Sequence, residues 1–378
     1  MKFGILTLPL WNNYGGILQC FALKKFLSKH DVETLLINYH HPKTTLFNHY
    51  KRKLKDLIKV KVSGADSVDI YPTYQDKNEI SKNTLKFIQK YLGPSTEYIS
   101  SNEELSNVNS LVDGVIVGSD QVWRPNYTPN IYAYYLDFLD NDKLKIAYAA
   151  SFGTDKWLYT DEETNICKSL LQNFDLISVR EDSGISLVKD KFGAEAEQFI
   201  DPTLLLSKSD YLALMPEPSP AKGKSIFTYV LDEDGFTKDF INKASEKLGL
   251  DPFKVMPSKF DINYSKEKSE YQYPPVEQWI SAFFSSDYVI ADSFHGCVFA
   301  IIFNKPFIAI GNVERGLTRF TSLLKLFDLE ERLILKDEAY DEGILYKEID
   351  WKSVNDTHTK LRENAAYSLM DVIDKGKR

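Results

Sequence analysis

One histidine occupies a position where its side chain can do chemistry. His295 stands in the segment IADSFHGCVFAIIF, between an apolar strand pattern that ends at Ala291 and an apolar helical pattern that starts near Gly296. An imidazole changes charge near neutral pH and can also hold a phosphate, although most lone histidines only stabilise a fold. Because a strand-to-helix turn faces a cleft, His295 is a candidate for proton transfer or anion binding.

Arginines stand near the ends of two other predicted strands. Arg180 follows the run DLISV and precedes Glu181 at the expected start of a helix. A guanidinium at such a position binds a carboxylate or phosphate in bidentate fashion, and the alternative is a structural ion pair with Glu181 or Asp182. Arg315 lies in a later strand-end loop, GNVERG, and together with Arg319 it supplies positive charge to a chain of net charge -8.

Polar loops follow further predicted strands, and ligands of parallel sheets bind at strand ends because helix N-termini expose N–H groups there. Asp120, shortly after the buried strand GVIV, is either a general base or the cap of the next helix. The asparagines of WNNYGG either approach a ligand or only form a turn. The candidate cleft-lining residues are Asn12, Asn13, Tyr14, Gly15, Gly118, Ser119, Ser151, Gly153 and Asn312.

Several kinds of site have no signature in the sequence. No His, Cys and carboxylate cluster has the spacing of metal ligands, and no GxGxxG, Walker or GxSxG motif occurs, so we expect no metal and no cofactor. The acidic balance argues against nucleic acid as a partner. Three separated cysteines, two of them in apolar helical patterns, and no apolar run long enough to span a membrane predict a cytoplasmic protein.

Strand and helix patterns alternate along the chain and determine where these loops lie. This alternation predicts an α/β fold of two doubly wound parallel sheets, each covered by helices on both faces. A proline-containing stretch after residue 205 suggests a crossover between domains. We predict a first domain at residues 1–205 with a helical insertion at 43–92, a second at 206–350, and a C-terminal helix at 351–378 that packs back on the first domain.

Six motifs occur in order over nearly the whole chain: NNYGGILQCFAL, DGVIVGSDQVW, AYAASFG, SVREDSG, DPTLLL and DSFHGCVFAIIFNKPFI. Together they resemble the polysaccharide pyruvyl transferase family. The resemblance implies two Rossmann-like domains facing across a cleft, as in glycosyltransferases of the GT-B type. It also implies phosphoenolpyruvate as donor, and a sugar or lipid-linked oligosaccharide of cell-surface polysaccharide, such as capsule or exopolysaccharide, as acceptor.

The resemblance also implies roles for individual residues. His295 and Arg180 match the family's donor-binding histidine and arginine, but Ser293 stands where members that form ketals commonly have a second arginine. We expect His295 to act as the acid and Asp120 or Glu181 as the base. The expected donor-binding residues are Arg180, Ser183, Ser293, Gly296 and Arg315, with Arg315 replacing the missing charge.

Two other functions fit the same fold. A glycosyltransferase would use a nucleotide-sugar donor, and a non-catalytic sugar-binding member would bind the acceptor alone. The basic segment from Lys51 to Lys61 is either a solvated helical face or a patch in peripheral contact with the inner membrane surface, beside a lipid-linked acceptor.

Overall fold

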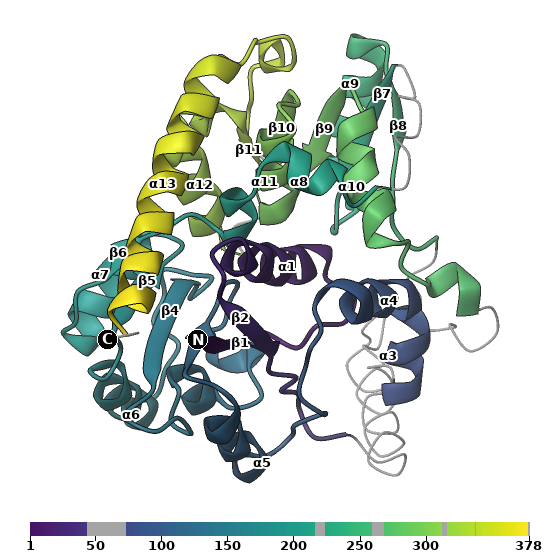
Figure 1. Cartoon of the computed structure of the whole chain (residues 1–378). Coiled ribbons are helices and arrows are strands. Elements are labelled where there is room, and N and C mark those ends of the chain that lie inside the picture. Colours follow the sequence, from purple (N-terminus) through teal and green to yellow (C-terminus); the bar gives the residue numbers. More distant parts are fainter. Residues whose placement is uncertain (44–72, 216–223, 259–267, 312–315, 337, 377–378) are drawn as a thin grey trace, which may run out of the picture.

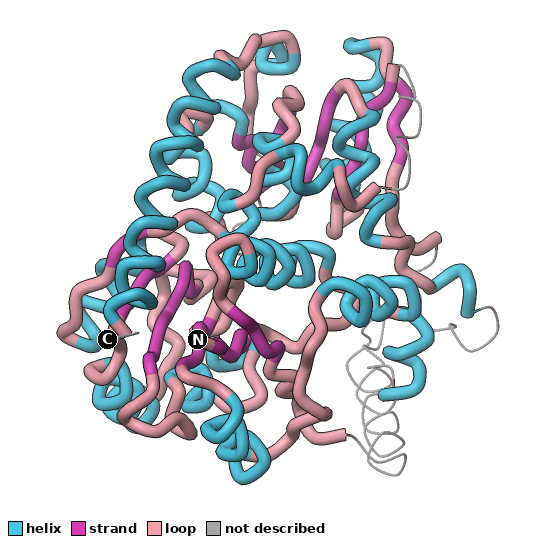
Figure 2. The backbone as a smooth tube through the Cα atoms, viewed as in Figure 1, coloured by secondary structure: helices cyan, strands magenta, loops and turns pink. Residues whose placement is uncertain are grey.

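Two parallel β-sheets flanked by helices make up the structure (Figures 1 and 2). The computed structural model describes residues 1–43, 73–215, 224–258, 268–311, 316–336 and 338–376. The predicted α/β fold with two doubly wound sheets is confirmed. The basic segment from Lys51 to Lys61 lies outside the described residues.

The first sheet has the strand order β2-β1-β3-β4-β5-β6, with every pair parallel. Its strands are β1 (Lys2–Leu6), β2 (Glu33–Leu36), β3 (Gly114–Val117), β4 (Leu144–Ala150), β5 (Leu176–Val179) and β6 (Glu197–Gln198). Its helices are α1 (Tyr14–Ser28), α3 (Tyr74–Ile80), α4 (Lys82–Tyr91), α5 (Asn102–Ser106), α6 (Asp161–Leu171) and α7 (Asp182–Leu187). All four residues of β3 are buried, as expected for the interior of a sheet covered on both faces.

The second sheet has the order β11-β10-β9-β7-β8 and is also parallel. Its strands are β7 (Ser225–Tyr229), β8 (Asp251–Phe253), β9 (Tyr288–Ala291), β10 (Phe307–Gly311) and β11 (Leu333–Leu335). The accompanying helices are α8 (Lys208–Leu212), α9 (Gly235–Leu248), α10 (Val276–Ser285), α11 (Phe294–Ile302), α12 (Thr318–Leu326) and α13 (Trp351–Lys375). The central strands β7, β9 and β10 are buried throughout.

In each sheet the order in which successive strands are added reverses at one strand. Strands β2 and β3 flank β1, and β8 and β9 flank β7 in the same way. The loops that leave two such neighbouring strands diverge, which opens a crevice at their carboxyl ends. A ligand site is therefore expected at the ends of β1 and β3, of β7 and β9, or of both pairs.

Helix α1 lies between the two sheets (Figure 1). Most of its residues are buried, which agrees with its nearly continuous apolar sequence, because a helix that is apolar all round is covered all round. At its start, the Tyr14 ring stacks on Trp279 of α10 with centroids 5.4 Å apart, and the Tyr14 hydroxyl donates to Pro274 O at 2.8 Å. These contacts hold the first turn of α1 against the second sheet's helices.

Helix α13 runs alongside both halves of the molecule (Figure 1). Asp350 caps its start by accepting hydrogen bonds from the N–H groups of Lys352 and Ser353. Further along, His358 Nε2 lies 2.6 Å from Leu204 O, and Gly376 beyond its end lies against a side chain of β4. Among the described helices, none has the length and apolar character needed to cross a membrane.

Candidate active site

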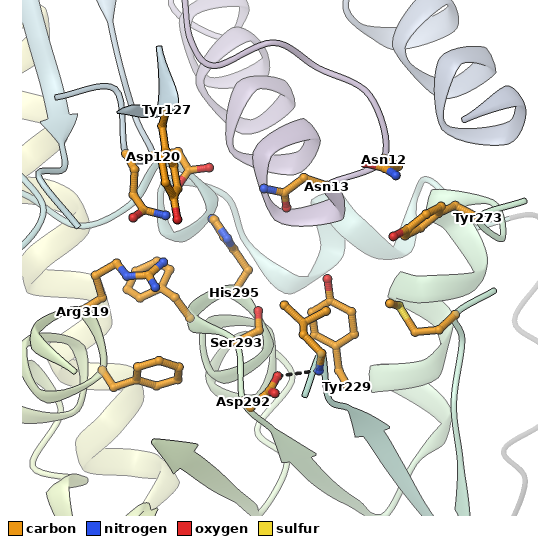
Figure 3. A pocket seen from close by; sticks show the side chains of 15 residues that line it. Asn12, Asn13, Asp120, Tyr127, Tyr229, Tyr273, Asp292, Ser293, His295 and Arg319 are labelled. Carbon is orange, nitrogen blue, oxygen red and sulfur yellow. Dashed lines mark hydrogen bonds between the residues drawn. The ribbon is translucent and has the colours of Figure 1, made fainter. Parts of the chain in front are cut away.

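A cavity of about 420 Å³ lies where the ends of β1 and β3 face those of β7 and β9 (Figure 3). This size suits a small molecule. Of the predicted residues, the cavity brings together Asn12, Asn13, Asp120, Ser293 and His295. The remaining lining residues are Gln121, Tyr127, Tyr229, Leu231, Met256, Tyr273, Asp292, Phe294, Arg319 and Phe320.

Three helices begin at this cavity. Asn13 is the N-cap of α1, Ser293 is the N-cap of α11, and Arg319 lies in the first turn of α12. The two cap side chains accept hydrogen bonds from Gly16 N at 3.2 Å and Gly296 N at 3.4 Å. The N–H groups at a helix start carry partial positive charge, so three helix starts at one cavity favour an anionic ligand.

His295 belongs to the first turn of α11. The sequence predicted a helix start near Gly296, but α11 starts at Phe294, so the imidazole projects from the helix rather than from the preceding turn. Its Nε2 lies 3.5 Å from Asp201 Oδ2, and its ring lies against Gly15 of α1. A Cβ atom on Gly15 would lie 2.0 Å from the Nδ1 atom, so the close approach of these two elements requires glycine.

Asp201 is the residue to which most of the surrounding polar groups bind. Its Oδ1 accepts from Thr203 N at 3.0 Å and Thr203 Oγ1 at 2.7 Å, and its Oδ2 accepts from Ser119 Oγ at 3.1 Å and Arg180 Nη1 at 3.0 Å. Burial alone raises the pKa of this carboxyl, but His295 and Arg180 outweigh burial and hold the pKa below its ordinary value. Asp201 was not among the predicted site residues, although the motif DPTLLL contains it.

Arg180 is surrounded by carboxylates. Its guanidinium lies 3.5 Å from Asp120, 3.2 Å from Glu181 and 3.0 Å from Asp201. The side chain is 2% exposed, and its Cζ lies 4.2 Å from the centroid of the Phe294 ring. The geometry therefore agrees with the ion-pair alternative for Arg180, which lies beneath the cavity wall instead of projecting into the cavity.

Among the described arginines, Arg319 lines the cavity. Burial, and next the positive charge of nearby Arg180, lower the pKa of its guanidinium. A desolvated cation beside a second cation gains stability when an anion enters the same space. The sequence indicated positive charge at Arg319 but did not include it among the donor-binding residues.

Asp120 lines the cavity from the loop after β3. The helix that it might have capped does not follow, because the chain continues in 3₁₀ turns at Pro125–Tyr127 and Ile131–Tyr135. The loop bends sharply at Gly118, whose φ is +118°, and a Cβ there would lie 2.3 Å from Tyr148 O. Glycine is thus required for the bend that turns Asp120 toward the cavity.

Four predicted residues lie behind the cavity wall and hold the loops in place. Ser151 Oγ donates to Glu181 Oε1 at 2.6 Å and accepts from Gly153 N at 3.0 Å. Ser119 Oγ also donates to Ala149 O at 2.8 Å. Both carboxylates are buried, but Glu181 does not line the cavity and is bound by both Ser151 and Arg180, so Asp120 is better placed to accept a proton from a ligand.

The other predicted residues are spread over several elements. Tyr14 faces α10, Ser183 lies in α7, and Gly296 packs α11 against Ala291 of β9. Asn312 and Arg315 lie outside the described residues.

Aromatic side chains form much of the cavity wall. The aromatic lining residues are Tyr127, Tyr229, Tyr273, Phe294 and Phe320. None of them was a predicted site residue, because the predictions rested mainly on polar residues and glycines after strands. Rings of this kind can stack on a sugar ring while the polar groups orient it. Within the described residues, no group of three or more His, Cys, Asp or Glu side chains could hold a metal ion.

Solved structures with two facing domains resemble this chain in fold. Arabidopsis thaliana UGT89C1 complexed with UDP-L-rhamnose aligns with a TM-score of 0.50 and 11% identity, covering 100% of this chain and 98% of that one. Phytolacca americana apo UGT2 aligns with a TM-score of 0.47 and 10% identity over 100% of both chains. Rickettsia bellii UDP-N-acetylglucosamine 2-epimerase aligns with a TM-score of 0.41 and 11% identity, covering 99% of this chain and 96% of that one. The predicted GT-B-like fold is confirmed.

A family model described as polysaccharide pyruvyl transferase matches residues 13–314, which is most of the chain and includes both Asp120 and His295. No curated protein matches the sequence. The family resemblance that the six motifs indicated is therefore confirmed, and it supports a transferase. The chain belongs to the polysaccharide pyruvyl transferase family.

Proposed function

We propose that this protein transfers the pyruvyl unit of phosphoenolpyruvate onto two hydroxyls of a sugar, which forms a cyclic ketal during the synthesis of a cell-surface polysaccharide. One observation supports the donor most directly: three helix starts, Arg319 and His295 meet at a single cavity of about 420 Å³. Phosphoenolpyruvate carries a phosphate and a carboxylate on three carbons, so its charge and size suit such a cavity.

In this proposal Arg319 binds one of the donor's two anionic groups, the phosphate or the carboxylate. The N–H groups at the starts of α1 and α11 bind the other. Arg180 lies beneath the wall and holds Asp120, Glu181 and Asp201 in place through its ion pairs. Each charge-assisted hydrogen bond stabilises a bound ligand by roughly 1.5 to 3 kcal/mol. The cavity thereby offsets the missing arginine at position 293, where this chain has serine.

In the proposed reaction, His295 delivers a proton to the methylene carbon of phosphoenolpyruvate, and one sugar hydroxyl oxygen bonds to the adjacent carbon. The second hydroxyl oxygen then bonds to the same carbon. At the same time the bond between that carbon and the phosphate oxygen breaks, and its electron pair leaves with phosphate. Asp120 accepts the hydroxyl protons in turn. One of these two protons restores His295 and the other leaves on inorganic phosphate, so atoms and charges balance.

Binding and turnover together test this proposal. We expect phosphoenolpyruvate to raise the melting temperature of the purified protein and UDP to leave it unchanged. With a panel of sugar acceptors, His295→Gln should release phosphate at least about a hundredfold more slowly, since general acid catalysis contributes on that order or more. His30→Gln, an exposed change at the end of α1, is the matched control.

Two outcomes would contradict the proposal. Stabilisation by UDP but not by phosphoenolpyruvate would indicate a nucleotide-sugar transferase. Full phosphate release by His295→Gln would remove the acid role of the imidazole.

A further inference from the structure

A second cavity adjoins the first. It encloses about 290 Å³ and shares Asn13 and Tyr127 with the larger cavity. Its other lining residues come from the loops after β1 and β2, from Tyr74 and Lys77 of α3, and from Tyr98. Asn13 and Tyr127 therefore form the boundary that the two cavities share.

Aromatic rings form a rigid box on one side of the second cavity. The Trp11 ring meets the His40 and Tyr74 rings edge-on, with centroids 5.3 Å and 5.5 Å apart. His40 in turn stacks on Tyr98 at 4.9 Å, and Tyr98 meets Tyr74 at 5.7 Å. Since each ring is held by two others, the box presents fixed apolar surfaces of the kind on which sugar rings stack.

Among the described residues that line this cavity, the side chains with a formal charge at neutral pH are Lys43 and Lys77. Lys43 Nζ lies 4.4 Å from the centroid of the Tyr98 ring and 4.7 Å from that of Tyr74, and Lys77 Nζ lies 5.8 Å from the Trp11 ring. None of the described residues that line the cavity is acidic, although the whole chain has a net charge of -8. Burial first, and then Lys77 and the other neighbouring cations, lower the pKa of His40 to about 4, so the lysines supply the charge at neutral pH.

We propose that the second cavity is the acceptor subsite and that it selects an anionic sugar, one that carries a phosphate or a carboxylate. Lys43 and Lys77 bind the negative group, the aromatic box holds the ring, and the ring of Tyr127, which is 45% exposed between the two cavities, supports the sugar unit whose hydroxyls enter the first cavity. This inference rests on the proposed function, because an acceptor is needed only if a group is transferred.

Three probes test the proposal: glucose 1-phosphate, glucuronate and glucose, each titrated into the full-length protein by calorimetry. We expect the wild-type protein to bind at least one charged probe about tenfold or more tightly than glucose, and Lys43→Gln/Lys77→Gln to lose that preference. The matched control is Lys82→Gln/Lys86→Gln, which removes two charges from the exposed face of α4 and should change nothing. Added salt should weaken binding of the charged probe to the wild-type protein only.

Each outcome decides the question. Preference for glucose 1-phosphate indicates a phosphate-bearing acceptor, and preference for glucuronate indicates an acidic sugar. Equal affinity for all three probes, or a preference that survives Lys43→Gln/Lys77→Gln, overturns the proposal. Phosphoenolpyruvate binding is measured on the same samples. If the wild-type protein does not bind phosphoenolpyruvate, the proposed function is refuted, whereas the anionic sugar site is still tested by the sugar probes.

Discussion

Asp201 follows β6 of the first sheet and His295 follows β9 of the second, and the two side chains meet with Oδ2 of the carboxylate 3.5 Å from Nε2 of the imidazole. The carboxylate is itself held by Thr203, Ser119 and Arg180. The orientation of the imidazole therefore depends on the first half of the molecule, even though the second half supplies the side chain.

Asp201→Asn tests this dependence. The amide keeps nearly the same shape but loses the charge that faces Arg180 and His295. We expect turnover to fall at least about tenfold and the free energy of unfolding to fall by about 1–3 kcal/mol, because buried Arg180 loses an ion-pair partner and His295 loses the carboxylate beside it. Asp142→Asn, an exposed change before β4, is the control. Unchanged phosphate release in Asp201→Asn would contradict a positioning role.

The stability difference between the wild type and Asp201→Asn should depend on pH. Burial raises the pKa of Asp201, but His295 and Arg180 lower it more, so the folded-state pKa lies below the ordinary value. Such a carboxyl stabilises the fold above the ordinary pKa and loses that contribution as the pH falls through the folded-state value. Urea unfolding should show a constant difference between wild type and Asp201→Asn near neutral pH that shrinks below about pH 4. A difference that grows on acidification would refute this.

Gly15→Ala should displace the imidazole, since the new Cβ would lie 2.0 Å from His295 Nδ1. We expect a turnover loss of about tenfold or more, caused by misplacement of a catalytic group. Gly235→Ala, at the start of α9 with nothing within 4 Å of the added Cβ, should keep full activity. Phosphate release at saturating donor distinguishes the two variants, and equal rates would show that the close approach is unimportant.

Arg319→Gln should weaken phosphoenolpyruvate binding by roughly 10- to 100-fold, which corresponds to the loss of one charge-assisted contact. Arg319→Lys keeps the charge without the planar fork, and we expect an intermediate affinity. Arg362→Gln on α13 is the matched control. Calorimetric titration measures all three, and wild-type affinity in Arg319→Gln would place the donor elsewhere.

His40 should make the fold sensitive to mild acid. Burial and then Lys77 lower its pKa to about 4, whereas the unfolded chain titrates near 6.5. The unfolded state therefore takes up a proton first, and up to about 3 kcal/mol of stability is lost as the pH falls from 6.5 to 4. Replacement His40→Gln should flatten this part of the pH profile in urea unfolding. Parallel profiles for the two proteins would contradict the buried, neutral state of the ring.

Much of the fold could be predicted because its signals are local. Runs such as GVIV have the composition of buried parallel strands, and the alternation with helical patterns predicts doubly wound sheets. The same reasoning selected Asp120 and His295 from the segments that follow strands, and both line the cavity. It erred by two residues at the start of α11, because helix boundaries depend on capping geometry.

The sequence by itself determined which residues stand at the ends of the strands and which family the motifs indicate. Only the tertiary structure decided that three carboxylates enclose Arg180, that Arg319 lines the cavity, and that Asp201 supports His295. The reason is physical: periodicity reports the face on which a residue lies, whereas these contacts join segments up to about a hundred residues apart. Their distances depend on how the two sheets and α1 pack together.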